Sequence, residues 1–291
     1  MDANHLIKVS SIQNICIHDG NGIRTTVFLK GCFLHCPWCC NPETISTDIN
    51  YFYNPEKCLK EKQIISALCT DCEIKGGSRP KEQCKFGAYK PTCKNYTTDD
   101  LLKVLLRDQY LYEESNGGIT FSGGEPFLQA SNIKELLQQL KQRNINVAFE
   151  TSLFCPHNSF NALLPYIDTF FIDLKLQFGF IINKTINNDY SNEFLQNLRL
   201  LQRQKDKQLI YRYVFIPEAL KDSRSQELFI ANLLELNVGH LEILPYHTLA
   251  RKKYEQVNVI FHEFKTPTPA DISSLTTLLE SNNVNYTILK Y

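Results

Sequence analysis

The chain has 291 residues and balances 31 basic against 31 acidic side chains, so its formal net charge is zero. That balance gives no electrostatic reason to expect nucleic acid or an anionic membrane surface as a partner. No apolar run reaches the length of about 18 residues that a membrane-spanning helix needs, and the first five residues lack a charged-then-apolar signal pattern. We therefore expect a soluble, cytoplasmic protein.

The chain contains eleven cysteines, and eight of them lie between Cys32 and Cys84. In the cytosol thiols stay reduced, and clustered cysteines there bind metal more often than they form disulfides. Metal binding is therefore the first functional expectation.

The first predicted strand covers Ile23–Leu29 and follows a turn at Asp19–Gly22. The loop directly after it, Gly31–Glu43, carries three cysteines at the spacing Cys-x3-Cys-x2-Cys: Cys32, Cys36 and Cys39. Three thiolates on one loop can hold three irons of a [4Fe–4S] cube, whose usual complement is four cysteines. The spacing predicts a cluster with one iron open to another ligand.

Residues 45–93 follow neither the helical nor the strand period, because Pro, Lys, Gly and Cys are interspersed among few apolar side chains. Such a segment has too little apolar surface for a core of its own and needs a metal to order it. We expect residues 45–93 to form an insertion in a main domain made of residues 1–44 and 94–291.

After Thr97–Asp100, which has the threonines and acidic residues of a helix start, short apolar strands alternate with amphipathic helices. The expected strands are Gly118–Ser122, Asn146–Glu150, Thr169–Leu174, Leu209–Ile216, His240–Leu244 and Tyr286–Leu289. The expected helices begin near Leu101 and then cover Ser131–Arg143, His157–Tyr166, Asn192–Arg203, Ser225–Leu236 and Ala270–Glu280. With the first strand this makes six β/α units and an extra strand, the pattern of a parallel sheet with crossover helices.

Polar residues gather where these strands end, which is where parallel α/β folds place reactive groups. They are Ser122–Pro126, Glu150–Ser152, Asp173–Lys175, Arg212 within its strand, and Pro245–His247. Carboxylates can bind an ammonium group and ribose hydroxyls, and cations can bind a carboxylate. The set suits an amino acid attached to a nucleoside.

Five short sequence motifs follow one another along the chain. They are His18–Cys32, Trp38–Cys39 with Asn41–Glu43, Gly117–Pro126, Leu244–His247 and Lys253–Glu255. In this order they resemble the glycyl-radical-enzyme activating enzymes, a family of the radical S-adenosylmethionine (SAM) superfamily that includes the pyruvate formate-lyase activating enzyme. The resemblance implies an α/β fold, a partial (β/α)6 TIM-like barrel with a small cysteine-rich, ferredoxin-like insertion.

The resemblance also implies two cofactors, a [4Fe–4S] cluster on Cys32, Cys36 and Cys39 and SAM on its open iron. The residues implied to bind SAM are Gly123, Gly124, Glu125, Thr151, Asp173, Lys175 and His247. Lys175 and Arg212 are implied to act where the radical meets its substrate. In the family, one electron from a flavodoxin- or ferredoxin-type reductant cleaves SAM to methionine and a 5′-deoxyadenosyl radical. That radical takes a hydrogen atom from a glycine of a partner glycyl radical enzyme.

Many family members carry two further clusters in such an insertion, and two clusters need eight thiolates. This insertion has five cysteines, which supports at most one auxiliary [4Fe–4S] cluster. We expect its ligands to be Cys58, Cys69, Cys72 and Cys84, with Cys93 as the substitute. A four-thiolate zinc site is the alternative.

The sequence departs from the family pattern mainly on the substrate side. Glu150-Thr151-Ser152-Leu153 replaces Asp-Thr-Ser/Asn-Gly, and Leu176 stands where a polar residue is common. Cys40 adds a thiol that we expect to be packed and neutral. The departures favour one alternative, a radical SAM enzyme of the same fold that acts on a small molecule or a peptide. A second alternative is a non-catalytic metal-binding scaffold.

Overall fold

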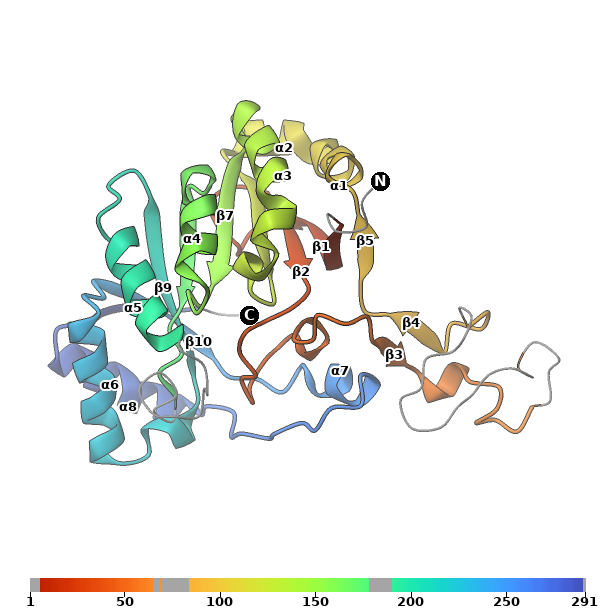
Figure 1. The fold of residues 1–291 in the computed structure, drawn as a ribbon. Helices are drawn as coiled ribbons and strands as arrows, with labels where there is room; N and C mark the ends of the chain where they lie inside the picture. The colour runs from red at the N-terminus through yellow and green to blue at the C-terminus, as the bar shows by residue number, and fades with distance from the viewer. Residues whose placement is uncertain (1–5, 65–68, 70–83, 178–189, 290–291) are drawn as a thin grey trace.

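The fold is built on one large mixed sheet, seen in a computed structural model that describes residues 6–64, 69, 84–177 and 190–289 (Figure 1). The strand order is β11-β10-β9-β8-β7-β6-β2-β1-β5. The strands are β1 (Ile7–Cys16), β2 (Arg24–Leu29), β5 (Lys94–Tyr96), β6 (Gly118–Gly123), β7 (Asn146–Thr151), β8 (Thr169–Asp173), β9 (Gln208–Phe215), β10 (His240–Pro245) and β11 (Asn285–Ile288). Because β5 and β11 lie at opposite ends of this order, the sheet of the described residues is an open, partial barrel.

All neighbouring strands in the series β2, β6, β7, β8, β9, β10 and β11 pair in parallel, which confirms the predicted alternation of strands and helices. The sequence did not reveal β1 and β5, which extend the sheet as antiparallel edge strands. Strand β1 is hard to recognise because polar residues fill most of Ser10–Asn14, and because Ile15 interrupts the strand with a positive φ of 59°.

In the described part of the chain, eight α-helices connect and cover the strands. They are α1 (Thr98–Leu105), α2 (Gln109–Ser115), α3 (Ala130–Gln142), α4 (His157–Leu163), α5 (Tyr190–Leu201), α6 (Ser223–Glu235), α7 (Arg251–Gln256) and α8 (Pro269–Ser281). Short 3₁₀ turns cover Pro42–Thr44, Pro55–Lys57, Leu106–Asp108, Pro126–Gln129, Leu164–Tyr166 and Pro217–Leu220. The Thr97 hydroxyl accepts a hydrogen bond from Asp100 N at 3.1 Å, which confirms the predicted start of α1. Helices α2 and α7 were not predicted, because seven and six residues are too few to display a period.

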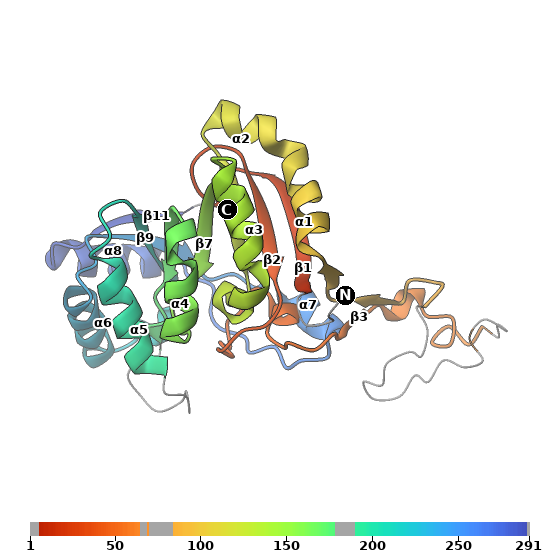
Figure 2. The same ribbon diagram turned by 45° about the horizontal axis from the view of Figure 1, so that its top comes forward.

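Side chains alternate between the two faces of the parallel strands and divide the sheet into an apolar and a polar side. Apolar residues such as Phe149 and Ile172 pack with the inward faces of the helices, for example Leu137 of α3. Figure 2 shows α3, α4 and α5 side by side on this face. The opposite face carries the polar residues of the strand ends: Ser122, Glu150, Asp173, Arg212 and Glu242.

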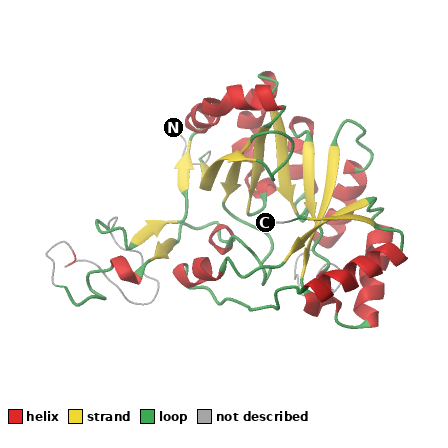
Figure 3. Ribbon diagram, turned by 180° about the vertical axis from the view of Figure 1, so that it is seen from behind, coloured by secondary structure: helices red, strands yellow, loops and turns green. Residues whose placement is uncertain are grey.

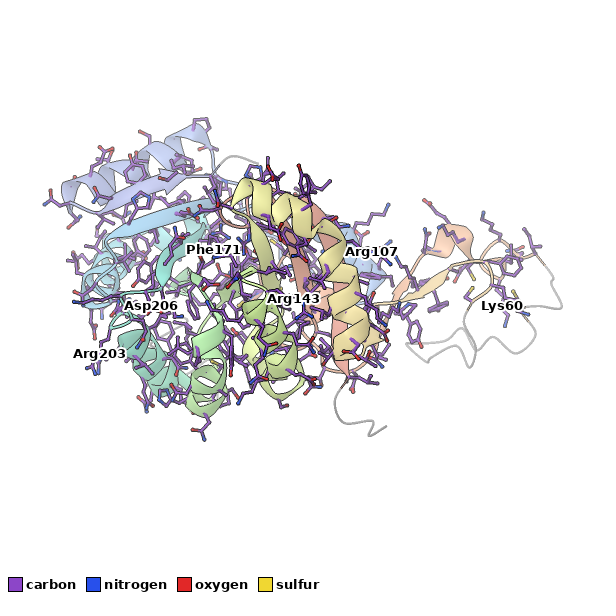
Figure 4. The ribbon with its side chains drawn as sticks, turned by 90° about the horizontal axis from the view of Figure 1, so that it is seen from above. Lys60, Arg107, Arg143, Phe171, Arg203 and Asp206 are labelled. Atoms are coloured by element: carbon purple, nitrogen blue, oxygen red, sulfur yellow. The ribbon has the colours of Figure 1, made fainter. Side chains whose placement is uncertain are left out.

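A second sheet pairs β3 (Tyr51–Tyr53) with β4 (Tyr89–Pro91) in antiparallel register. It lies to one side of the main sheet, as Figure 3 shows from behind. In Figure 4 the labelled Lys60 lies far from the main sheet, in the same projecting part of the chain as β3 and β4, whereas Phe171 lies over the main sheet. Strands β3 and β4 fall in the segment predicted as an insertion. The boundaries of that insertion, between residues 44 and 45 and between residues 93 and 94, stay a prediction.

None of the helices in the described ranges has the length and apolar character needed to cross a membrane.

Candidate active site

Backbone hydrogen bonds hold the cysteine loop, Gly31–Glu43, both where it begins and in its interior. Where it begins, Gly31 N donates to Thr44 O at 2.6 Å and Cys32 N donates to Ile45 O at 2.9 Å. Within the loop, Cys39 N donates to Cys36 O at 3.1 Å. The thiol sulfurs of Cys32 and Cys39 each accept a backbone N–H at 3.4 Å. Such contacts fix the direction of a sulfur that is to serve as a ligand.

The paired glycines after β6 let that segment lie directly against the cysteine loop. Gly124 N donates to Leu29 O at 2.9 Å, and Glu125 N donates to Gly31 O at 2.8 Å. A Cβ on Gly124 would lie 2.0 Å from Gly31 O, so a side chain does not fit there. Gly123 adopts a φ of +99°, in the region that favours glycine. These glycines thus serve the close approach of two backbone segments.

One cavity of about 220 Å³ joins the cysteine loop to the carboxyl ends of the strands. It is lined by Cys32, Leu34, Cys36, Trp38, Cys39, Cys40, Asn41, Ser122, Gly123, Gly124, Glu125, Glu150, Thr151, Ser152, Asp173, Lys175, Arg212, Val214 and Leu244. The structure therefore brings together the three predicted cluster cysteines and every predicted SAM-binding or catalytic residue except His247.

Glu125 is almost fully buried, and its carboxylate accepts hydrogen bonds from the end of β7. Thr151 Oγ1 donates at 2.7 Å, and Ser152 donates from its N at 3.0 Å and from its Oγ at 2.8 Å. Burial raises the pKa of Glu125, and these donors act in the opposite direction. The side chain of Glu125 thus ties the loop after β6 to β7.

Arg212 is bound between two carboxylates on the polar face of the sheet. Its Nη1 lies 2.6 Å from Glu150 Oε1, and its Nε lies 2.9 Å from Glu242 Oε2. Nη2 donates to His18 O at 3.1 Å, and the guanidinium lies 3.9 Å from the ring centroid of Phe171. Burial lowers the pKa of Arg212, but the two glutamates outweigh it and the net shift is upward. The residue is a charged crosslink between β7, β9, β10 and the turn before β2.

Lys175 brings a positive charge to the cysteine loop. Its Nζ lies 3.2 Å from Asp173 Oδ2. Burial lowers the pKa of Lys175, but Asp173 and the thiols of Cys36 and Cys39 more than offset this, so the pKa is raised. Lys175 is therefore an ammonium ion at neutral pH, placed between a carboxylate and the cluster thiols.

The donor set of the loop fits a [4Fe–4S] cluster. Burial, with the nearby Glu125, raises the pKa of Cys32 to about 12, and burial also raises the pKa of Cys36 and Cys39. Half-buried thiols with a raised pKa ionise readily when a strong positive charge binds them, as the irons of a cluster do. The same three sulfurs line the cavity that also holds the strand-end residues.

The remaining predicted residues lie elsewhere. His247 follows β10 and is half-buried, with its Nδ1 accepting from Leu249 N at 3.4 Å. Cys58 is buried behind the turn Pro55–Lys57, and Cys69 and Cys84 are half-buried. Cys72 lies outside the described residues.

Some residues that hold the cysteine loop were not recognised as functional from the sequence. Lys253 and Tyr254 of α7 and Glu43 of the loop make direct contacts with one another or with the cysteines. All three belong to the motifs Asn41–Glu43 and Lys253–Glu255. The sequence thus marked these residues but did not show that they contact one another or the cysteines.

Comparison with known proteins decides the family. Residues 18–193 match the family model described as "4Fe-4S single cluster domain". The chain is 33% identical to the isethionate sulfite-lyase activating enzyme of Nitratidesulfovibrio vulgaris, over 84% of this chain and 85% of that protein. It is 31% identical to the 4-hydroxyphenylacetate decarboxylase activating enzyme of Clostridioides difficile, over 86% and 84%. The chain belongs to the glycyl-radical-enzyme activating enzymes.

A solved structure supports the fold assignment. A radical SAM methyltransferase from Sphaerobacter thermophilus superimposes with a TM-score of 0.54 at 14% identity, over 98% of this chain and 77% of that one. As a glycyl-radical-enzyme activating enzyme, the protein is a radical SAM oxidoreductase with a [4Fe–4S] cluster and SAM as its cofactors. The predicted family, fold class and cofactors are thus confirmed.

Proposed function

We propose that this activating enzyme installs a glycyl radical on a partner enzyme, using SAM bound at the cavity described above. The observation that carries the proposal is that one cavity is lined both by the three cluster cysteines and by the strand-end residues of β6 to β9. A ligand bound to an iron of the cluster would thereby be within reach of carboxylates, hydroxyls and an ammonium group.

The chain's residues then have distinct tasks. The cofactors, when bound, supply one-electron cleavage of SAM and a hydrogen-abstracting radical. The backbone at Gly123–Glu125 lies nearest the cluster loop and suits the amino end of SAM. Thr151 and Asp173 suit the ribose or the carboxylate, and Lys175 completes the pocket, whereas His247 lies outside the cavity lining. Arg212 keeps Glu150 at the cavity wall, on the side where substrate would meet the radical.

The proposed partner is a glycyl radical enzyme, and the proposal is supported by relatives that are named as activating enzymes of a decarboxylase or a sulfite-lyase. A flavodoxin- or ferredoxin-type protein is the proposed reductant, because cleavage needs one low-potential electron. We propose the cytoplasm as the compartment, because free thiols and iron–sulfur clusters require reducing conditions.

The insertion at residues 45–93 is proposed to hold one auxiliary [4Fe–4S] cluster on Cys58, Cys69, Cys72 and Cys84. Burial raises the pKa of Cys84, but backbone hydrogen bonds led by those of Phe86 and Tyr89 outweigh it and lower the pKa below its ordinary value of 9.0. This environment favours a thiolate ligand. Cys93, by contrast, is buried beside Lys30 of the main body, which supports leaving it out of the ligand set. Zinc on the same four thiolates is the alternative.

The function is tested with anaerobically reconstituted protein, a chemical reductant and SAM. We expect a [4Fe–4S] absorption and electron paramagnetic resonance (EPR) spectrum, release of 5′-deoxyadenosine, and a glycyl-radical doublet on a candidate glycyl radical enzyme from the same genome. Cys36→Ser should abolish all three. Cys16→Ser, which changes a cysteine on β1 outside the cavity lining, is the matched control and should retain them.

The outcomes separate the alternatives. Cleavage of SAM without a radical on any glycyl radical enzyme would favour the small-molecule or peptide substrate. Absence of both the cluster spectrum and SAM cleavage would leave only the metal-binding scaffold. Iron and zinc analysis of a Cys58→Ser variant distinguishes the two metals of the insertion.

A further inference from the structure

Helix α7 reaches the cysteine loop through two consecutive side chains. Lys253 Nζ donates to Asn41 Oδ1 and to Glu43 Oε1, each at 2.8 Å, and lies 3.4 Å from Cys40 O. Tyr254 Oη donates to Cys39 O at 3.0 Å. The helix and the loop are more than two hundred residues apart in sequence, so these contacts are a tertiary clamp.

Two lysines contact Glu43, one at its carboxylate and one at its backbone carbonyl. Lys253 pairs with its carboxylate, while the buried Lys30, the residue directly before the cysteine loop, donates from Nζ to the Glu43 carbonyl at 2.6 Å. Glu43 is 5% exposed, and within the described residues its Oε2 has no hydrogen-bond partner. A buried carboxylate with one free oxygen depends strongly on its remaining cation. Lys253 is therefore the group that makes the buried charge of Glu43 tolerable.

The Tyr254 contact completes the fixation of one cluster cysteine. Cys39 N donates to Cys36 O, and the Cys39 sulfur accepts from Asn41 N at 3.4 Å. With Tyr254 Oη on its carbonyl, Cys39 has its N–H, its C=O and its sulfur all bound. No other element within the described residues is hydrogen-bonded by a side chain to this carbonyl.

Tyr254 is also held by contacts within its own segment. Tyr254 is 3% exposed, and its ring packs edge-on against Phe261 at 5.2 Å between centroids. Its backbone N donates to Ala250 O at 3.2 Å. The Tyr254 ring is therefore fixed by its own segment, which sets the direction of the hydroxyl that reaches Cys39 O.

We propose that Lys253 and Tyr254 are positioning residues for the [4Fe–4S] cluster. They hold the chain from Cys39 to Glu43 so that the Cys39 sulfur stays at the cavity. The proposal rests on the cluster assigned to this loop and is independent of which substrate the radical attacks. Removing residues that orient metal ligands without binding the metal themselves commonly changes metal affinity by about 10- to 100-fold.

The test uses the full-length, cluster-loaded protein and compares Lys253→Met and Tyr254→Phe with the wild type. The first readout is the anaerobic rate at which iron passes to a ferrous chelator, and we expect it to rise about tenfold in Lys253→Met. The second is the EPR spectrum of the reduced cluster with and without SAM, which should broaden or shift in both variants. Lys253→Arg should restore most of the wild-type behaviour, since it keeps the charge.

Lys252→Met is the matched control, because Lys252 is an exposed lysine on the same helix. It should release iron at the wild-type rate. Tyr254→Phe removes only one hydroxyl and keeps the buried ring, so it remains informative if Lys253→Met fails to fold. Iron release and spectra equal to the control in both Lys253→Met and Tyr254→Phe would overturn the proposal. A wild type that forms no glycyl radical, together with faster iron release in Lys253→Met, would instead count against the proposed function and leave this proposal intact.

Discussion

Arg212 of β9 and Glu150 of β7 form an ion pair across the intervening strand β8, with 2.6 Å between Nη1 and Oε1. Glu150 in turn accepts a hydrogen bond from Ser122 Oγ, at the residue before the paired glycines. The pair therefore links the middle of the sheet to the segment that lies against the cysteine loop. It also binds the turn before β2, through the His18 carbonyl.

Replacing Arg212 by Met should destabilise the protein, because it leaves the carboxylates of Glu150 and Glu242 without their common cation. Removing one partner of a buried pair typically costs about 3 kcal/mol. Chemical denaturation of the apo protein at pH 7 measures this free energy of unfolding. The double variant Arg212→Met/Glu150→Gln, which removes the orphaned charge, should recover part of the loss. A double variant that is less stable than Arg212→Met would contradict the ion-pair explanation.

The same variant should show a distinct pH dependence. Burial raises the pKa of Glu150 above 4.5, and Arg212 opposes that shift. Without Arg212 the folded-state pKa lies still higher, so the folded protein favours the protonated acid. A raised carboxyl pKa means that stability is greatest below the unfolded value and is lost as pH rises through the folded value. We expect the stability gap between wild type and Arg212→Met to be smallest near pH 4.5 and to widen toward pH 8. A gap independent of pH would assign the loss to packing alone.

Gly124→Ala should disrupt the contact between the loop after β6 and the cysteine loop. The new Cβ would lie 2.0 Å from Gly31 O, which is backbone and has no flexible end to move. Overpacking of this kind costs about 2 kcal/mol or more. Gly239→Ala is the control, since a Cβ there meets nothing within 4 Å. Thermal unfolding and SAM binding should both be impaired in the first variant only, and equal behaviour of the two would refute the packing argument.

Lys175→Met should make the cluster harder to reduce. The Lys175 ammonium is close enough to Cys36 and Cys39 for their charges to shift its pKa, and a nearby cation stabilises the more negative, reduced cluster. We expect the midpoint potential to fall by on the order of 50 mV, since Asp173 already neutralises part of the charge. An EPR-monitored redox titration measures the shift. Lys175→Arg keeps the charge and should stay near the wild-type potential; a fall of the same size there would point to geometry and not to charge.

Periodicity and motif order in the sequence were enough to predict the parallel strands, six of the helices and most residues that line the cavity. They could not reveal which polar residues pair, because lateral contacts depend on strand register. Arg212 was expected at the substrate, yet its described contacts are with Glu150, Glu242 and the His18 carbonyl. Helix α7 was missed for another reason: six residues carry too little period, and its importance comes from the distant loop that it contacts.

Thr151→Val should weaken the protein more than Ser152→Ala, although each removes a single hydroxyl that faces Glu125. Thr151 Oγ1 donates to Glu125 Oε1 at 2.7 Å, and within the described residues the one further donor to that oxygen is Phe127 N at 3.5 Å. Oε2 keeps Ser152 N at 3.0 Å after the loss of the Ser152 hydroxyl. A buried acceptor that loses its partner costs about 1–3 kcal/mol, and one that retains a donor costs less. Denaturation of the apo variants measures the difference. In a Glu125→Gln background the gap should shrink, because the acceptor charge is gone; a gap that persists undiminished would show that Thr151 acts independently of Glu125.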